Sequence, residues 1–237
     1  MAKTFLKAEW RKLSMFNYAI DPAVLLPYLP AGTEIDFHEN TCYVSLVGFM
    51  FLNTRLRGIR VPFHSNFEEI NLRFYVTRTV NNEVKRGVVF IKEIVPKPAL
   101  SFVANTVYGE NYETLKMAHS WVEMDNTLKV NYAVKKGKWF NFGITASTTN
   151  LEALAGTEAE FITEHYWGYT KSGGAKTGEY GVEHPQWDVY KTIDYSVSMD
   201  FEILYGKDFA FLNGLQPKSV FLAEGSEILV KAGSHFS

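Results

Sequence analysis

The sequence predicts a β-dominated α+β fold, in which a barrel or sandwich of strands carries a few peripheral helices. Hydrophobic residues make up 46% of the chain and aromatic residues 15%. Aromatic and β-branched side chains favour the pleated, half-buried surface of a sheet. Roughly ten or more segments alternate apolar and polar residues and end at turn residues. No linker, repeat or low-complexity tract interrupts the 237 residues, so we expect a single domain over residues 1–237.

Strands are expected wherever this alternation runs between turn residues. Asn81-Asn82, Asp125-Asn126 and Ser172-Gly173-Gly174 mark turns between such segments. The expected strands cover residues 10–19, 34–37, 42–52, 67–77, 85–95, 100–108, 117–124, 127–135, 139–147, 179–184, 189–197, 219–223 and 227–231.

Helices are expected at three places. The segment 21–30 begins with Asp-Pro, which suits an N-cap followed by the first helical position. Thr157 and Glu160 form a capping-box pattern, so a helix should begin there and run to about residue 166 or 168. Residues 200–214 resemble one or two short helices. On the middle helix, one face would carry Glu160, Glu164 and Trp167.

Composition excludes several classes of partner. The formal net charge is −2 and no basic stripe occurs, which argues against nucleic acid. Cys42 is the only cysteine, so an intramolecular disulfide is excluded. No run reaches the roughly 18 apolar residues of a membrane span, and MAKTFLKAEW lacks the apolar core of a signal peptide. We therefore expect a soluble, cytoplasmic protein without a membrane partner, and exposed strand edges leave a homodimer open.

The strand FEEINLRFYV, residues 67–76, is the most informative segment. Period-2 alternation places Glu69, Asn71 and Arg73 on one face, and the opposite face is mostly apolar. Each buried polar group without a partner costs roughly 1–3 kcal/mol. In the lumen of a barrel, a ligand would supply those partners. The alternatives are a face open to solvent, or a structural ion pair between Glu69 and Arg73.

The stretch from residue 161 to residue 187 is rich in aromatic and histidine side chains. Pro185 restricts His184 to an extended backbone, so His184 could present its ring to a pocket as an acid, a base or an anion donor. Tyr166 would help to close that pocket and Trp187 would form an apolar wall. The spacing of Glu164, His165 and His184 matches no common metal pattern, so we expect no metal, and His165 is better explained by core packing.

Seven segments together carry a resemblance to a known family: WRKLSMFNYAIDPAVLLPYLPAGTEID, CYVSLVGFMF, FEEINLRFYV, VANTVYGENY, AEFITEHYWGYT, VEHPQW and SVFLAEGSEILV. The set resembles the uncharacterised YqjF-like bacterial proteins, which are distantly similar to the acetoacetate decarboxylase superfamily. The resemblance covers nearly the whole chain. It implies a mixed, mainly antiparallel barrel with a central pocket, and it implies no assigned reaction.

The decarboxylase relatives use a lysine that forms a Schiff base with a β-keto acid. The comparable run here, residues 109–113, lacks their lysine pair, and Ala19 stands where they have an arginine. The acidic position of the relatives corresponds to Glu69. Lys116, Lys92 or Lys97 could in principle replace the lysine, although an exposed surface lysine is the simpler interpretation of each.

These observations lead to one functional hypothesis and two alternatives. We expect a pocket that binds a small organic carboxylate or oxo compound and uses acid–base chemistry without a Schiff base or a cofactor. The first alternative is a non-catalytic metabolite-binding or sensing protein, and the second is a decarboxylase-like lyase using Lys116. The expected catalytic residues are Glu69 and His184, and the expected ligand contacts are Asn71, Arg73, Tyr166 and Trp187.

Overall fold

The computed structural model describes residues 3–152, 154–172 and 176–237. Its strands are β1 (Thr4–Ala19), β2 (Glu34–Ile35), β3 (Phe37–His38), β4 (Thr41–Leu56), β5 (Ile59–Arg60), β6 (Phe67–Val80), β7 (Glu83–Val95), β8 (Tyr112–Thr114), β9 (Lys116–Met124), β10 (Thr127–Lys136), β11 (Lys138–Leu151), β12 (Trp167–Ser172), β13 (Lys176–Glu183), β14 (Val189–Ser198), β15 (Ser219–Lys231) and β16 (Ser234–Phe236). Its helices are α1 (Pro98–Val103), α2 (Glu158–Thr163) and α3 (Phe201–Tyr205), with 3₁₀ turns at Pro22–Val24, Leu26–Tyr28 and Lys207–Leu212 and a π-helical segment at Ala104–Tyr108. None of these helices is long and apolar enough to cross a membrane.

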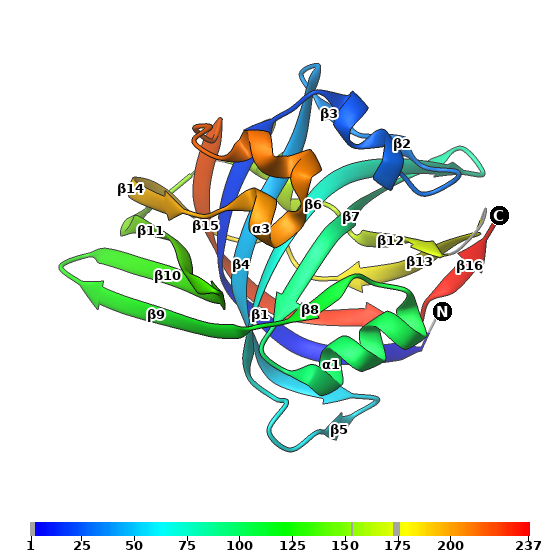
Figure 1. Ribbon diagram of the computed structural model, residues 1–237, viewed down its shortest axis with the longest axis horizontal. Helices are drawn as coiled ribbons and strands as arrows, with labels where there is room; N and C mark the ends of the chain where they lie inside the picture. Colours follow the sequence, from blue (N-terminus) through cyan, green and yellow to red (C-terminus); the bar gives the residue numbers. More distant parts are fainter. Residues whose placement is uncertain (1–2, 153, 173–175) are drawn as a thin grey trace.

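Seven strands form a closed barrel in the order β13, β12, β7, β6, β4, β1 and β15 (Figure 1). The pairing of β13 with β15 closes the ring. Within the ring only β12 and β7 run parallel, and the other neighbours are antiparallel. The predicted β-dominated, mixed and mainly antiparallel barrel is therefore confirmed.

A second group of strands extends the sheet beyond the barrel. From β15 the sheet continues through β14, β11 and β10 to β9, and these strands project away from the ring in Figure 1. Their apolar side chains pack with those on the outer face of the barrel and with α3 in one hydrophobic cluster. A second cluster fills the barrel interior. The barrel wall thus has apolar contacts on both faces.

The strand β6 shows this division most clearly. Leu72 and Phe74 belong to the cluster outside the barrel, whereas Phe67 and Tyr75 belong to the cluster inside it. The alternation predicted for FEEINLRFYV is therefore confirmed. The side chains between Phe67 and Tyr75 on the inner face are the polar ones, which places them inside the barrel.

The segment predicted as a strand at residues 100–108 is instead helical, and that prediction is wrong. Pro98 occupies the start of α1, where its missing N–H costs nothing, and the chain continues as the π-helical segment. The Asn105 side chain forms two hydrogen bonds with the Tyr112 backbone: Nδ2 donates to the carbonyl at 2.9 Å, and Oδ1 accepts from the N–H at 2.7 Å. These two bonds fix both ends of the loop that carries Glu110.

The helix predicted from Thr157 begins as expected but ends early. The Thr157 side chain accepts from the Glu160 N–H at 3.3 Å, which confirms the N-cap. The helix stops at Thr163, and Trp167 begins β12 in pairing with β7 and β13. Sheet pairing therefore overrides the helical pattern, and the predicted shared face of Glu160, Glu164 and Trp167 is wrong.

Two other elements differ from the prediction. The segment 21–30 forms two 3₁₀ turns and not one helix, because Pro27 interrupts it; Asp21 still caps the first turn by accepting from the Ala23 N–H at 2.8 Å. The predicted strand pair at 219–223 and 227–231 is one continuous strand, β15, in which Gly225 has φ of +80°.

Two of the three predicted turns are confirmed. Asn81-Asn82 and Asp125-Asn126 each have two residues with positive φ and join paired antiparallel strands, as predicted. Most of the turn predicted at Ser172-Gly173-Gly174 lies outside the described residues.

Candidate active site

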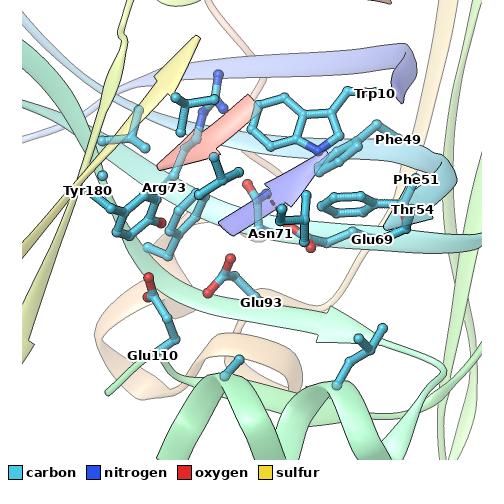
Figure 2. A pocket seen from close by; sticks show the side chains of 18 of the residues that line it. Trp10, Phe49, Phe51, Thr54, Glu69, Asn71, Arg73, Glu93, Glu110 and Tyr180 are labelled. Carbon is cyan, nitrogen blue, oxygen red and sulfur yellow. Dashed lines mark hydrogen bonds between the residues drawn. The ribbon is translucent and has the colours of Figure 1, made fainter. Parts of the chain in front are cut away.

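The barrel interior contains a cavity of about 270 Å³. Its walls are largely aromatic and aliphatic. Its polar side chains come from β4, β6, β7, β8 and β13, from the loops before β6 and β8, and from the segments before β12 and after β13 (Figure 2). Apolar walls with a few convergent polar groups are typical of small-molecule sites. The apolar lining includes Trp10, Leu13, Phe49, Phe51, Phe67, Phe90, Leu100, Ile162, Val182 and Trp187.

The three polar residues predicted on β6 all line this cavity. The exposed fraction is 3% for Glu69, 1% for Asn71 and 7% for Arg73, which excludes a solvent-facing surface. Glu69 pairs with Asn71, whose Nδ2 donates to Glu69 Oε1 at 3.0 Å. Among the described residues no carboxylate lies within salt-bridge distance of Arg73. The alternative of a Glu69–Arg73 ion pair is therefore wrong.

Among the described residues, the hydrogen-bond and ring contacts of Arg73 are with neutral groups. Its guanidinium donates to the carbonyl of Ile162 at 3.4 Å and lies 5.6 Å from the ring centre of Tyr75. Its Nε has no hydrogen-bond partner in the part of the chain that the structure describes. A buried guanidinium in this state has hydrogen-bond donors that match the geometry of a carboxylate.

Two further carboxyl groups face the cavity beside Glu69, and neither was predicted. Glu93 comes from β7, where it pairs in register with Asn71, and Glu110 comes from the loop before β8. Figure 2 shows Glu93 and Glu110 projecting toward the same space below Asn71 and Glu69. Three carboxyl groups thus converge from three separate segments.

Burial raises the pKa of all three carboxyl groups. It raises the pKa of Glu69 to about 7 and, together with the charge of Glu69, the pKa of Glu110 to about 8. Burial and the charges of Glu110 and Glu69 hold the pKa of Glu93 well above its usual range. Near neutral pH the cluster therefore retains protons that exposed carboxyl groups would have lost.

Two tyrosines complete the acidic cluster. The Tyr112 hydroxyl donates to Glu69 Oε2 at 3.3 Å, and Tyr180 lies beside Glu110, where burial and the charge of that carboxyl keep the tyrosine pKa well above its usual range. Within this cluster, Glu93 Oε2 and Asn71 Oδ1 have no hydrogen-bond partner among the described residues.

His184 and Trp187 also line the cavity, as predicted. Their rings stack with centres 4.2 Å apart, and Trp187 Nε1 donates to the Ser226 hydroxyl at 2.9 Å. His184 Nδ1 lies 2.9 Å from the Pro185 carbonyl, so Nδ1 carries the proton and Nε2 is the acceptor in the neutral ring. Burial lowers the pKa of His184, and the charge of Arg73 acts in the same direction.

Tyr166 lies behind His184, further from the cavity. Its ring centre is 4.7 Å from that of His184, and its hydroxyl donates to Glu164, but it is not among the residues that line the cavity. The structure therefore brings Glu69, Asn71, Arg73, His184 and Trp187 to one cavity and leaves Tyr166 behind His184.

His165 also lines the cavity, and its side chain is buried. Its Nε2 lies 3.2 Å from Asp36 Oδ2, and burial lowers its pKa. In the described part of the chain, no three His, Cys, Asp or Glu side chains come together as metal ligands.

The lysine hypothesis is wrong for Lys116. This residue is exposed at the start of β9, with its Nζ 6.0 Å from the ring centre of Trp139, outside the cavity. Lys92 points away from the cavity and donates to Glu113 at 3.0 Å. None of the described residues that line the cavity is a lysine.

Sequence reasoning missed Glu93 for a definite reason. Alternation from Val88 and Phe90, which line the cavity, would place Lys92 on the same face. A bulge shifts the register of β7 against β6 between Arg73 and Leu72, so that Glu93 takes that position. Glu110 lies in a loop, where no periodicity exists to orient it.

Solved structures share this fold. Acetoacetate decarboxylase from Legionella pneumophila superposes with a TM-score of 0.67 at 12% identity, covering 98% of this chain and 87% of that chain. The enduracididine biosynthesis enzyme MppR, complexed with pyruvate, gives 0.66 at 10% identity over 100% and 91%. An acetoacetate decarboxylase-like enzyme from Sphingomonas wittichii RW1 gives 0.66 at 10% identity over 99% and 94%. At such identities the similarity establishes the fold alone.

Sequence comparison gives the family. The uncharacterized protein YqjF of Bacillus subtilis (strain 168) is 30% identical over 73 residues, and the match spans 30% of this chain and 30% of that protein. The DUF2071 family, described as an uncharacterized conserved protein, matches residues 7–227. The chain therefore belongs to the DUF2071 family, as the resemblance to the YqjF-like proteins implied.

Proposed function

We propose that this protein binds a small organic carboxylate in the barrel cavity and acts on it by general acid–base chemistry, without a Schiff base. The observation that carries the proposal is the buried guanidinium of Arg73, which lines the cavity and has no carboxylate partner among the described residues. A ligand carboxylate would supply that partner, with two N–H groups available for a bidentate contact. Asn71 and the Trp187 wall would hold the rest of the ligand.

The acid–base part of the proposal rests on Glu69 and His184. Glu69 has a pKa of about 7, so both of its protonation states are populated near neutral pH, as an efficient general base requires. His184 lines the same cavity, close enough to Arg73 that the guanidinium charge helps to lower the pKa of His184. For a 2-oxo acid, ionised Glu69 would remove a proton from the carbon next to the carbonyl group, and His184, whose neutral ring offers Nε2 as an acceptor, would position the ligand beside it.

Arg73→Gln should weaken the binding of pyruvate, a 2-oxo acid that also occupies the structural neighbour MppR, by about 30-fold or more. Isothermal titration calorimetry would measure the affinity, and circular dichroism would report the fold. Arg55→Gln, at an exposed position on β4, is the matched control and should bind like the parent. Equal affinity in all three proteins would refute an anion site at Arg73.

Glu69→Gln and His184→Ala should each reduce catalysed exchange of the pyruvate methyl protons with D₂O, measured by NMR. The rate should rise with pH up to about 7 and then level off, because the ionised form of Glu69 is the base. Glu68→Gln, one residue away on the opposite face of β6, should keep the parent rate. Binding without any catalysed exchange would instead favour the metabolite-binding or sensing protein.

A further inference from the structure

The cavity contains hydrogen-bond acceptors that a carboxylate or oxo compound does not use. Among the described residues, Glu93 Oε2 and Asn71 Oδ1 have no hydrogen-bond partner, although Tyr112 and Glu110 lie beside the Glu93 carboxyl group, and the Glu93 and Asn71 side chains are both at least 97% buried. Glu93 and Asn71 are register partners on adjacent strands about 5 Å apart, so both side chains lie on the same face of the sheet and line the cavity. The amide orientation follows from the Asn71 Nδ2 contact with Glu69, which leaves Oδ1 as an acceptor only.

A ligand atom placed between these acceptors must donate hydrogen bonds. Carboxylate and carbonyl oxygens cannot do so, whereas a hydroxyl, an amine or a guanidinium can. The charge of the surroundings selects among these donors. Three carboxyl groups face this part of the cavity, and a cation would favour their ionised forms, in which every carboxylate oxygen is an acceptor, where a neutral hydroxyl would not. The described residues form no metal-ligand group here, so the cation is organic.

We infer that the ligand carries a protonated nitrogen, as an ammonium or guanidinium group, which binds Glu93 and Asn71 while its carboxylate binds Arg73. This inference rests on the proposed function for the Arg73 end alone. Asn71 and Arg73 are two residues apart on one face of β6, which separates them by about 7 Å along the strand. The substrate class is therefore an amino or guanidino acid whose charged ends are separated by a short carbon chain.

Two ligands of equal size allow the contribution of the ammonium site to be measured separately from that of the carboxylate site. In 5-aminopentanoate an ammonium group replaces the terminal methyl group of hexanoate, and the carboxylate is the same. Titration calorimetry at pH 7 should give at least 10-fold tighter binding for 5-aminopentanoate. Glu93→Gln should remove this preference and leave hexanoate affinity within about twofold, whereas the control Glu68→Gln should keep the preference.

Proton release provides an independent readout. The carboxyl cluster holds protons at pH 7, and a bound ammonium group favours its ionised form. Binding of 5-aminopentanoate should therefore release protons, seen as different heats in phosphate and in Tris buffer, and hexanoate should release none. Glu93→Gln should reduce the release.

The outcomes distinguish the two proposals. If hexanoate binds in an Arg73-dependent manner and 5-aminopentanoate binds no better and releases no protons, the ammonium site is refuted and the carboxylate site stands. Preferential binding of 5-aminopentanoate that survives Arg73→Gln would support the ammonium site and refute the carboxylate site. If neither compound nor 4-guanidinobutanoate binds, both proposals fail.

Discussion

Glu93→Gln is expected to stabilise the folded protein at pH 8 and to change its stability little at pH 4.5. The fold raises the pKa of Glu93 well above its ordinary value of 4.5 because the carboxyl group is buried beside Glu110 and Glu69. At pH 4.5 the unfolded chain still keeps about half of this proton, and more at lower pH, so ionisation costs the fold little. As the pH rises further, the unfolded chain loses the proton first, and the folded state becomes progressively less stable until the pH passes the folded pKa.

Glutamine cannot ionise, so the variant escapes this loss. Each unit of pKa displacement corresponds to about 1.4 kcal/mol, and each kcal/mol shifts the melting temperature of a chain of this size by about 2–4 °C. Thermal melts from pH 4.5 to pH 8 would therefore show two curves that diverge with increasing pH. Glu68→Gln controls for the loss of a carboxyl group outside the cavity. Parallel curves for Glu93→Gln and the parent would show that Glu93 is not held protonated.

Gly225→Ala is expected to lower the stability of the folded protein severely. Gly225 has φ of +80°, and a Cβ built on it would lie 2.0 Å from the carbonyl oxygen of Trp10. The positive φ alone costs an alanine roughly 1–2 kcal/mol. The backbone contact adds to this, because β1 and β15 cannot separate without losing their paired hydrogen bonds. We expect a total destabilisation above about 4 kcal/mol, or failure to fold.

Gly137→Ala measures the cost of positive φ alone, without a steric clash. Gly137 has φ of +74° in the turn between β10 and β11, and its Cβ would meet nothing within 4 Å. It should lose only about 1–2 kcal/mol in urea unfolding, and soluble expression would give a second comparison of the two variants. Equal losses in Gly137→Ala and Gly225→Ala would mean that β1 and β15 accommodate the methyl group.

Most of the barrel could be predicted from periodicity because strands with two different faces carry that pattern in their sequence. Residues 67–76 show this best, since polar and apolar positions alternate without a break. The helix after Thr157 shows the limit. Its start depends on a local cap, but its end depends on pairing between Trp167 and a strand about 80 residues earlier in the chain, which no local pattern records.

The candidate site divides in the same way. Glu69, Asn71 and Arg73 could be predicted because one strand carries them in register. Glu93 could not, because a bulge changes the face on which it lies, and Glu110 depends on how a helical segment and a loop are folded against the barrel. A sequence pattern reports relations within an element, whereas a binding site joins several elements.

The double-sided wall of β6 has a consequence for how this protein can change. The inner positions Glu69, Asn71 and Arg73 line the cavity, and the outer positions Ile70, Leu72 and Phe74 belong to the hydrophobic cluster outside the barrel. Under the proposed function, ligand preference depends on the odd-numbered positions of this short segment, and fold stability depends on the even-numbered ones. New specificities can arise by substitution at the odd-numbered positions while the even-numbered ones preserve the scaffold, and a library restricted to 69, 71 and 73 would retain a high fraction of folded members.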